Sequence, residues 1–275
     1  MTPWQPEIFS APALERVWED ERRRQLNLVP FFPGLMTGET GALVESFAGE
    51  PEVHHPIRGR VRGVAAFERF VADTRRWVTE HDVTVEDVVF VLTPERGVEE
   101  LVLRGDGFEV PVAIASDHAA GGIAEVRVYF SSWPRTGRHA VRPPLLQPDG
   151  VVTVPDVVGD HQRALAAGDV EAAVATFEPD GTLREPAGGA YVHHGAEALR
   201  ELYARFFSGG GVALEQCALT DDGRACALEY NVVGWGHTAM QPQAGIAIYV
   251  RGESGRLAAA RIYDDAEPPI GDPRG

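Results

Sequence analysis

The sequence contains no lysine, because all 25 of its basic residues are arginine. An ε-amine is required for Schiff-base catalysis, for anchoring pyridoxal phosphate and for the lysine of a phosphate-binding loop. These three kinds of site are therefore excluded. Carboxylates, histidines and tyrosines remain as the groups that could transfer protons.

Cysteine is also scarce. Cys217 and Cys226 are the only two in the chain, too few for a disulfide framework or a cysteine metal site, so we expect a reduced, cytoplasmic setting. The first residues lack a basic segment followed by an apolar one, and no apolar run approaches the roughly 18–20 residues of a membrane span. We therefore expect neither a secretory signal nor a membrane span.

Positive charge is in the minority, with 41 acidic residues against 25 basic ones and a net charge of −16. Nucleic acids and anionic membrane surfaces both require a positive face on their protein partners. The sequence thus predicts no nucleic-acid partner and no membrane partner. Its 275 residues suit one large domain or two small ones.

An internal repeat favours two domains. Residues 39–47 align with 169–177, and the closing strand at 125–130 aligns with 260–264, with a spacing of roughly 130 residues throughout. A proline-rich stretch separates the halves. We therefore predict a first domain over 1–142 with an N-terminal helical extension, a linker over 143–150 and a second domain over 151–275.

Hydrophobic periodicity in the second half predicts helices first and strands afterwards. The expected helices span residues 156–167, 170–177 and 196–207. The expected strands span residues 212–219, 225–233, 244–250 and 257–263, with hairpin turns at Asp222-Gly223 and Ser254-Gly255. This order indicates an α+β fold, with helices packed on one face of an antiparallel sheet.

The three helices, a Glu-Pro turn, the strand meander and the terminal segment Arg261-Ile262-Tyr263-Asp264-Asp265 together resemble the nuclear transport factor 2-like superfamily. Its enzymatic branches include SnoaL-like polyketide cyclases, ketosteroid isomerase, limonene epoxide hydrolase and scytalone dehydratase. The resemblance implies two tandem cone-shaped domains of the cystatin-like type, each with N-terminal helices packed on a curved antiparallel sheet. It also implies acid/base chemistry in an apolar pocket with no organic cofactor and no metal.

With two fused copies of this domain, the chain is similar to the polyether epoxide hydrolase/cyclases. The limonene epoxide hydrolase pattern has an aspartate between the arginine and the tyrosine of the last strand. Ile262 and Val128 occupy those positions here, which argues against epoxide opening by that acid/base pair.

Glu185 is the leading candidate acid/base residue. It precedes Pro186 where the resemblance implies a pocket carboxylate, and an apolar pocket suits such a carboxylate to general acid or base catalysis near neutral pH. The alternative is a surface glutamate paired with Arg184. In the first half the matching position is His55.

His193 and His194 are candidate proton shuttles. Because adjacent side chains point in different directions, we expect at most one of them to face the pocket. Glu229 and Asn231 share one face of a strand, so they either polarise a substrate inside the cone or lie on the outer face in solvent.

Further candidates come from aromatic and polar residues of the second half. Asp264 is a catalytic candidate that the first half lacks, and Trp235 and His237 are expected at the pocket mouth. The hydroxyl of Tyr263 either orients a ligand or is buried in the core. The residues expected to bind substrate are Tyr191, Asn231, Trp235, His237, Tyr249 and Tyr263.

We therefore expect a working pocket in the second half and a structural or regulatory copy in the first. The predicted function is cofactor-independent catalysis of the cyclase, isomerase, dehydratase or epoxide-opening type on a small apolar, oxygenated, polyketide-like metabolite of natural-product biosynthesis. The alternative is a non-catalytic small-molecule-binding or assembly protein of the same fold. We expect the halves to form an internal pseudo-dimer, and the sequence leaves further homo-oligomerisation open.

Overall fold

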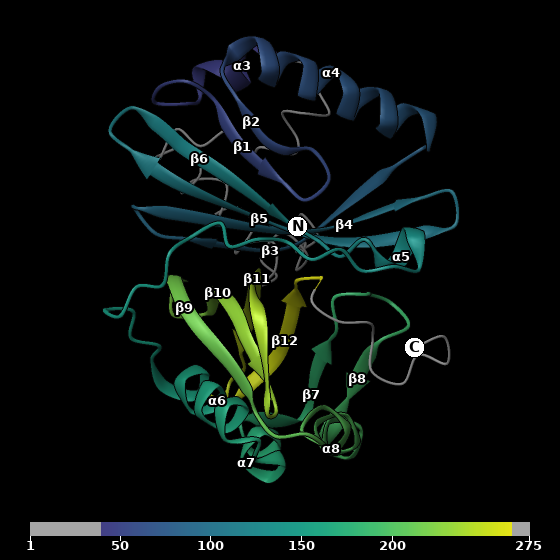
Figure 1. Ribbon diagram of the computed structural model, residues 1–275, viewed down its shortest axis with the longest axis vertical. Coiled ribbons are helices and arrows are strands. Elements are labelled where there is room, and N and C mark those ends of the chain that lie inside the picture. Colours follow the sequence, from purple (N-terminus) through teal and green to yellow (C-terminus); the bar gives the residue numbers. More distant parts are fainter. Residues whose placement is uncertain (1–39, 266–275) are drawn as a thin grey trace, which may run out of the picture.

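Two six-stranded sheets organise residues 40–265, the part of the chain that the computed structural model describes (Figure 1). The strand order is β2-β1-β6-β5-β4-β3 in the first sheet and β8-β7-β12-β11-β10-β9 in the second. The molecule thus contains two α+β domains of the same topology, as predicted. The predicted N-terminal helical extension lies outside the described residues.

The first domain begins with short helices and strands and continues as a meander. Its elements are α3 (Thr40–Glu45), β1 (Glu52–His55), β2 (Gly59–Arg62), α4 (Val64–Glu80), β3 (Thr84–Leu92), β4 (Arg96–Gly105), β5 (Phe108–Ala119), β6 (Gly122–Tyr129) and α5 (Trp133–Thr136).

The second domain repeats this plan with two helices at its start. Its elements are α6 (Asp156–Ala167), α7 (Val170–Ala175), β7 (Phe177–Arg184), β8 (Val192–His194), α8 (Gly195–Phe206), β9 (Val212–Asp221), β10 (Ala225–Trp235), β11 (Thr238–Arg251) and β12 (Leu257–Tyr263).

Local signals explain why the helices of the second domain begin and end where they do. Helix α6 ends at Gly168, which adopts the left-handed conformation (φ 67°) that glycine tolerates best. The next residue, Asp169, accepts a hydrogen bond from the Ala172 amide at 3.0 Å and so caps α7.

Each sheet is antiparallel except for one pair of strands. Strand β1 lies parallel to β6, and β7 lies parallel to β12. The sequence predicted wholly antiparallel sheets. The parallel pairs were missed because pairing between the first and last strands of a domain leaves no trace in local periodicity. These parallel pairs join the hairpins β1–β2 and β7–β8 to the four-stranded meanders of their domains.

The helices cover only one face of each sheet. Figure 1 shows α3 and α4 beyond the first sheet and α6, α7 and α8 beyond the second, so that the other faces of the two sheets lie against each other. An apolar cluster drawn from both domains fills this junction, including Val98 and Ala113 from the first and Ala227 and Ile246 from the second. Within residues 40–265 no helix has the length and apolar character needed to cross a membrane.

Candidate functional site

Each domain has a cavity between its helices and the inner face of its sheet. The cavity of the first domain has a volume of about 220 Å³, and that of the second has a volume of about 100 Å³. The larger cavity thus lies in the half of the chain expected to be a structural or regulatory copy. The polar groups of the two cavities differ.

Glu185 lies on the wall of the second-domain cavity, immediately after β7, and is 7% exposed. His193 on β8 donates a hydrogen bond from Nε2 to Glu185 Oε1 at 2.7 Å. The next residue, His194, is exposed and occupies the N-cap position of α8 without a side-chain hydrogen bond to it. Neither histidine lines the cavity, and His193 reaches it only through its bond to Glu185.

A tyrosine and an aspartate form a second polar pair on the same cavity. Tyr230 on β10 donates its hydroxyl to Asp264 Oδ2 at 2.9 Å, and both residues line the cavity. Burial, reinforced by the negative charge of Asp264, raises the pKa of Tyr230 well above its ordinary range. Tyr230 therefore remains a hydrogen-bond donor at physiological pH.

A buried histidine completes the polar lining. Thr176 Oγ1 donates to the Ala173 carbonyl at 2.6 Å, so it accepts the bond at 3.0 Å from His161 Nδ1. This assigns the proton of the neutral ring to Nδ1 and leaves Nε2 to accept from the Tyr203 hydroxyl at 3.3 Å. Burial lowers the pKa of His161 to about 4, so the ring is uncharged at neutral pH.

The remaining aromatic candidates lie in two different places. Tyr249 lines the cavity and accepts a hydrogen bond from Gln162 Nε2 at 2.8 Å. Trp235 also lines the cavity, and its ring packs on Phe206 with centroids 4.2 Å apart. His237, however, is exposed in the turn after β10 and does not line the cavity.

Tyr191 contributes through its backbone. Its carbonyl accepts from the Glu185 amide at 3.0 Å, and its amide donates to Gly188 at 2.7 Å. These bonds hold the turn between β7 and β8, which places His193 against Glu185.

Three candidates project from the opposite face of the second sheet and do not line the cavity. They are Glu229, Asn231 and Tyr263, with exposed fractions of 2%, 2% and 0%. The sequence left open whether Glu229 and Asn231 face the cone or lie in solvent. They lie on the outer face, and they are buried because the first domain and the linker cover that face. Asn231 Nδ2, for example, donates to the Leu146 carbonyl of the linker at 3.1 Å.

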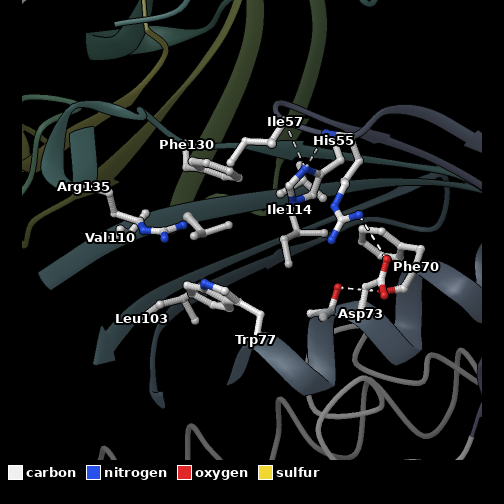
Figure 2. Close-up of a pocket in the computed structure, with 14 residues that line it drawn as sticks. His55, Ile57, Phe70, Asp73, Trp77, Leu103, Val110, Ile114, Phe130 and Arg135 are labelled. Atoms are coloured by element: carbon white, nitrogen blue, oxygen red, sulfur yellow. Dashed lines mark hydrogen bonds and ion pairs between the residues drawn. The ribbon is translucent and has the colours of Figure 1, made fainter. Parts of the chain in front are cut away.

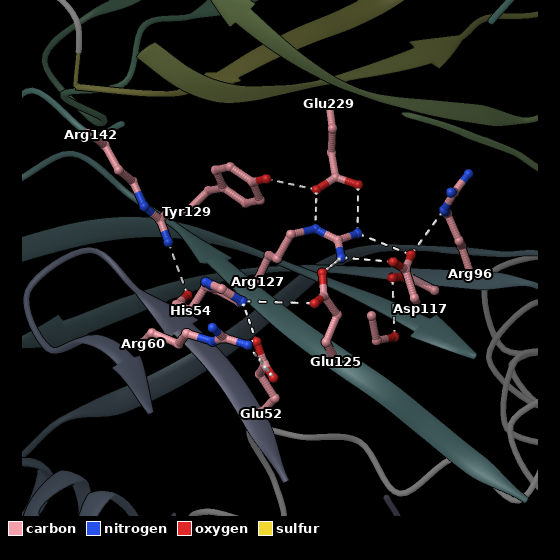
Figure 3. Close-up of polar contacts among 12 residues, drawn as sticks. Glu52, His54, Arg60, Arg96, Asp117, Glu125, Arg127, Tyr129, Arg142 and Glu229 are labelled. Atoms are coloured by element: carbon pink, nitrogen blue, oxygen red, sulfur yellow. Dashed lines mark hydrogen bonds and ion pairs between the residues drawn. The ribbon is translucent and has the colours of Figure 1, made fainter. Parts of the chain in front are cut away.

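Glu229 is held by the first domain. Arg127 Nε and Nη2 donate to Glu229 Oε1 and Oε2 at 2.7 and 2.9 Å, and the Tyr129 hydroxyl donates to Oε1 at 2.7 Å (Figure 3). Arg127 is fully buried and also binds Asp117 and Glu125. Glu229 thus takes part in a contact between domains.

Sequence reasoning missed three cavity residues, His161, Tyr203 and Tyr230. His161 lies on the apolar stripe of α6, three residues after Val158 and four before Leu165. That spacing marks an inward position, and a histidine found there is a candidate polar group within an apolar wall. Tyr230 follows Glu229 on β10, and successive side chains of a strand point to opposite faces of the sheet. Because Glu229 lies on the outer face, Tyr230 faces the cavity.

One cluster in residues 40–265 offers the atoms of a metal site. The ligand atoms of Glu52, His54 and Glu125 lie within 4.8 Å of one another. Arg60 already binds Glu52 at 2.7 Å, and Arg127 binds Glu125 at 2.5 Å. We assign no metal to these residues, because arginine occupies both carboxylates.

The sequence of the second domain matches a known family. Residues 158–260 fit the sequence model of the SnoaL-like domain. The second domain is therefore similar to the SnoaL-like domain over these residues, which make up less than half of the chain. The matched segment includes Glu185, His193 and Tyr230, and it ends before Asp264.

Several solved structures are similar to part of this chain. One is a protein named as a polyketide cyclase from Sinorhizobium meliloti, with 22% identity, a TM-score of 0.34 and coverage of 40% of this chain and 94% of that one. Another is an epoxide hydrolase/cyclase-like enzyme of pyran ring formation in salinomycin, with 18% identity, a TM-score of 0.34 and coverage of 41% and 90%.

A third is a protein from Catenulispora acidiphila with a ketosteroid isomerase-like fold, with 21% identity, a TM-score of 0.36 and coverage of 43% and 92%. A comparison with curated proteins gives no match.

Proposed function

We propose that the SnoaL-like domain catalyses a cofactor-independent acid/base reaction on a small, apolar, oxygenated molecule. The observation that carries this proposal is that Glu185 lies on the wall of an apolar cavity and is held from behind by His193 at 2.7 Å. The pair formed by Tyr230 and Asp264 lines the same cavity. A proton acceptor and a proton donor around one cavity are what isomerisation, dehydration or cyclisation requires.

The proposed roles follow from these contacts. Glu185 is the general base that removes a proton from the substrate, and His193 orients the carboxylate. Tyr230 gives its single hydroxyl proton to Asp264 in the free protein. In the complex this hydroxyl turns from Asp264 to the substrate oxygen on which negative charge develops, and donates its hydrogen bond there. Trp235 and the apolar walls exclude water from the reacting groups.

The substrate class follows from the cavity lining. Aliphatic and aromatic side chains supply most of the wall, including Leu183, Leu202, Val232 and Ile262, so the bulk of the ligand is apolar. An oxygen on the ligand would meet Tyr230. We propose a polyketide-like metabolite of natural-product biosynthesis as the substrate, with cyclase, isomerase, dehydratase or epoxide-opening chemistry as the reaction class.

A proton-abstraction assay tests the base without knowledge of the substrate. The probe is 5-nitro-1,2-benzisoxazole, an apolar molecule whose ring opens to a coloured phenolate when a base removes its C–H proton. We expect the wild-type protein to accelerate this opening above the buffer rate. We expect Glu185→Gln to lose most of that rate, by about 10²-fold or more.

Glu197→Gln is the matched control, because Glu197 is exposed on the neighbouring helix α8. It should retain the wild-type rate. Equal rates in the wild type and in Glu185→Gln would contradict the proposed base and favour a binding function for this domain. Mass spectrometry of metabolites that copurify with the wild-type protein would identify the substrate class.

A further inference from the structure

We propose that the first-domain cavity binds a neutral, apolar molecule that carries a carbonyl or ether oxygen, and that His55 donates a hydrogen bond from Nε2 to this oxygen. This site is separate from the proposed catalytic cavity and does not depend on it. The argument rests on the shape of the cavity, the tautomer of His55 and the state of the other polar groups in the wall.

The cavity has a volume of about 220 Å³ and lies between α4 and the strands β4, β5 and β6. Figure 2 shows His55 and Phe130 on one side of the residues that line it, with Trp77 and Leu103 on the other. Its apolar wall consists of Ile57, Phe70, Trp77, Leu103, Val110, Val112, Ile114, Val128 and Phe130. A wall of this kind selects a mainly apolar ligand.

The hydrogen bonds of His55 fix its tautomer. The backbone amides of Ile57 and Arg58 both donate to His55 Nδ1, at 3.2 and 3.3 Å. Nδ1 is therefore an acceptor, and the proton of the neutral ring is on Nε2. The described residues provide no hydrogen-bond acceptor for Nε2, so this N–H is available to a ligand.

The surroundings of His55 keep the ring uncharged. The ring lies between Phe70 and Phe130, with centroid distances of 5.5 and 5.4 Å. Burial, together with the positive charges of Arg142 and Arg58, lowers its pKa to about 3. His55 thus offers a ligand one neutral N–H and no charge, which suits a neutral oxygen better than a carboxylate.

Other polar groups of the wall also favour a ligand that brings its own acceptor. Trp77 Nε1 is buried and has no hydrogen-bond partner among the described residues. The carboxylate of Asp73 is engaged, because it binds Arg58 at 3.1 Å and Arg76 at 3.2 Å, and Thr74 Oγ1 gives its proton to the Phe70 carbonyl at 2.8 Å. The wall therefore presents His55 Nε2 and the guanidinium groups of Arg58 and Arg135 as donors. Of these guanidinium groups, Arg58 is paired with Asp73 and Arg135 lies over the Trp77 ring at 5.1 Å.

The two cavities differ most at one equivalent position. His54 pairs with Arg127 in the first sheet, and Arg184 pairs with Arg261 in the second. The next residues are His55 and Glu185, so the first domain has a neutral donor where the SnoaL-like domain has a carboxylate. This difference indicates binding in the first cavity and proton abstraction in the second.

A pair of probes of nearly equal shape tests the proposal. 2-Acetylnaphthalene carries a ketone oxygen, and 2-ethylnaphthalene replaces that ketone with a methylene group. Both are titrated into ¹⁵N-labelled full-length protein while the indole N–H signals of Trp77 and Trp235 are followed, since each tryptophan lines one of the cavities. We expect the ketone to shift the Trp77 signal and to bind about fivefold to tenfold more tightly than the hydrocarbon.

Two substitutions of His55 separate the proposed hydrogen bond from the structural role of the ring. His55→Asn keeps an acceptor for the amides of Ile57 and Arg58 but lacks the distal N–H, so it should bind the two probes equally. His55→Gln keeps a distal N–H and should retain a preference for the ketone. Equal binding of the probes to the wild type would overturn the proposal, as would binding that perturbs only Trp235 or a ketone preference that survives in His55→Asn.

Discussion

Glu100 and Glu229 each bind the arginine and the tyrosine that the other domain presents on its last strand. Glu229 accepts two hydrogen bonds from Arg127 and one from Tyr129. Glu100 in turn accepts from Arg261 Nε and from Arg261 Nη2, the latter at 2.6 Å, and from the Tyr263 hydroxyl. The junction between the domains is thus built from one contact made twice in opposite directions.

Sheet register shows that the two glutamates are equivalent. Glu100 pairs with Ala113, and Ala113 pairs with Tyr129. Glu229 pairs with Ile246, and Ile246 pairs with Tyr263 in the same way. Each glutamate therefore lies in the same row as the tyrosine of its own domain and binds the tyrosine of the other, as in a two-fold interface.

Removing one partner of the buried pair should destabilise the protein strongly. In Arg127→Met the Glu229 carboxylate stays buried and loses its arginine, which should cost about 3–5 kcal/mol of unfolding free energy. Urea denaturation followed by circular dichroism measures this loss. Arg127→Met combined with Glu229→Leu should recover much of it, because neither charge then remains unpaired. A loss below about 1 kcal/mol in Arg127→Met would contradict the importance of this contact.

The hydrogen bond from His193 should position the proposed base. His193→Leu removes the N–H that binds Glu185, so the nitrobenzisoxazole reaction should slow by roughly tenfold, less than in Glu185→Gln. His193→Gln, which retains an N–H, should recover part of the rate. A rate in His193→Leu equal to that of the wild type would argue against the positioning role.

The stability of the protein should fall on mild acidification. Burial lowers the pKa of folded His161 to about 4 and that of His55 to about 3, whereas both histidines titrate near 6.5 when unfolded. Above about pH 6.5 the rings are neutral in both states. Below it the unfolded state alone takes up protons, so each histidine should lower the unfolding free energy by about 1.4 kcal/mol per pH unit.

Urea denaturation of wild type and His161→Phe between about pH 6.5 and pH 5 measures this slope, in a range where carboxylates contribute little. The variant should show a shallower slope than the wild type but not a flat one, since His55 and His118 remain and burial lowers the pKa of both. Parallel slopes in the two proteins would mean that His161 is not held neutral in the fold.

The glycine opposite Tyr230 should tolerate no side chain. Gly245 pairs with Tyr230 across β10 and β11, and a Cβ atom added there would lie 2.6 Å from the tyrosine ring. Gly245→Ala should push Tyr230 away from Asp264 and cost about 1–3 kcal/mol of stability. Gly150→Ala is the control, because a Cβ there meets nothing within 4 Å. If Gly245→Ala had the same melting temperature as Gly150→Ala, the result would show that the Tyr230 ring moves aside without cost.

Local pattern was enough to predict much of the fold. The bounds of α6 and β12 agree with those predicted, since α6 ends at a glycine and β12 is bounded by the predicted turn at Ser254-Gly255. The parallel pairs β1–β6 and β7–β12 could not be predicted, because they join residues far apart in the chain.

The sequence predicted only part of the candidate site, because some contacts of its residues also join positions far apart in the chain. Glu185 and Trp235 line the cavity of the SnoaL-like domain, and Asp264 and Tyr249 join them. The position of Glu229 depends on Arg127, about a hundred residues away in the other domain, and alternation along one strand cannot reveal such a partner. The sequence also gave no measure of cavity size, which depends on how the side chains of several elements pack.

The two reciprocal contacts differ in the groups that surround them. Arg127 is bound by Glu229, Asp117 and Glu125, whereas Glu100 is bound by Arg261 and Arg184. The sheet positions equivalent to Asp117 and Glu125 are Val250 and Ala259, which pair with each other in the second sheet. In a symmetric homodimer both contacts would carry the same residues. Because one chain supplies both halves, Asp117 and Glu125 join the contact at Arg127 whereas Arg184 joins the contact at Glu100. The charges around the two contacts therefore differ, as those of identical subunits related by a two-fold axis could not.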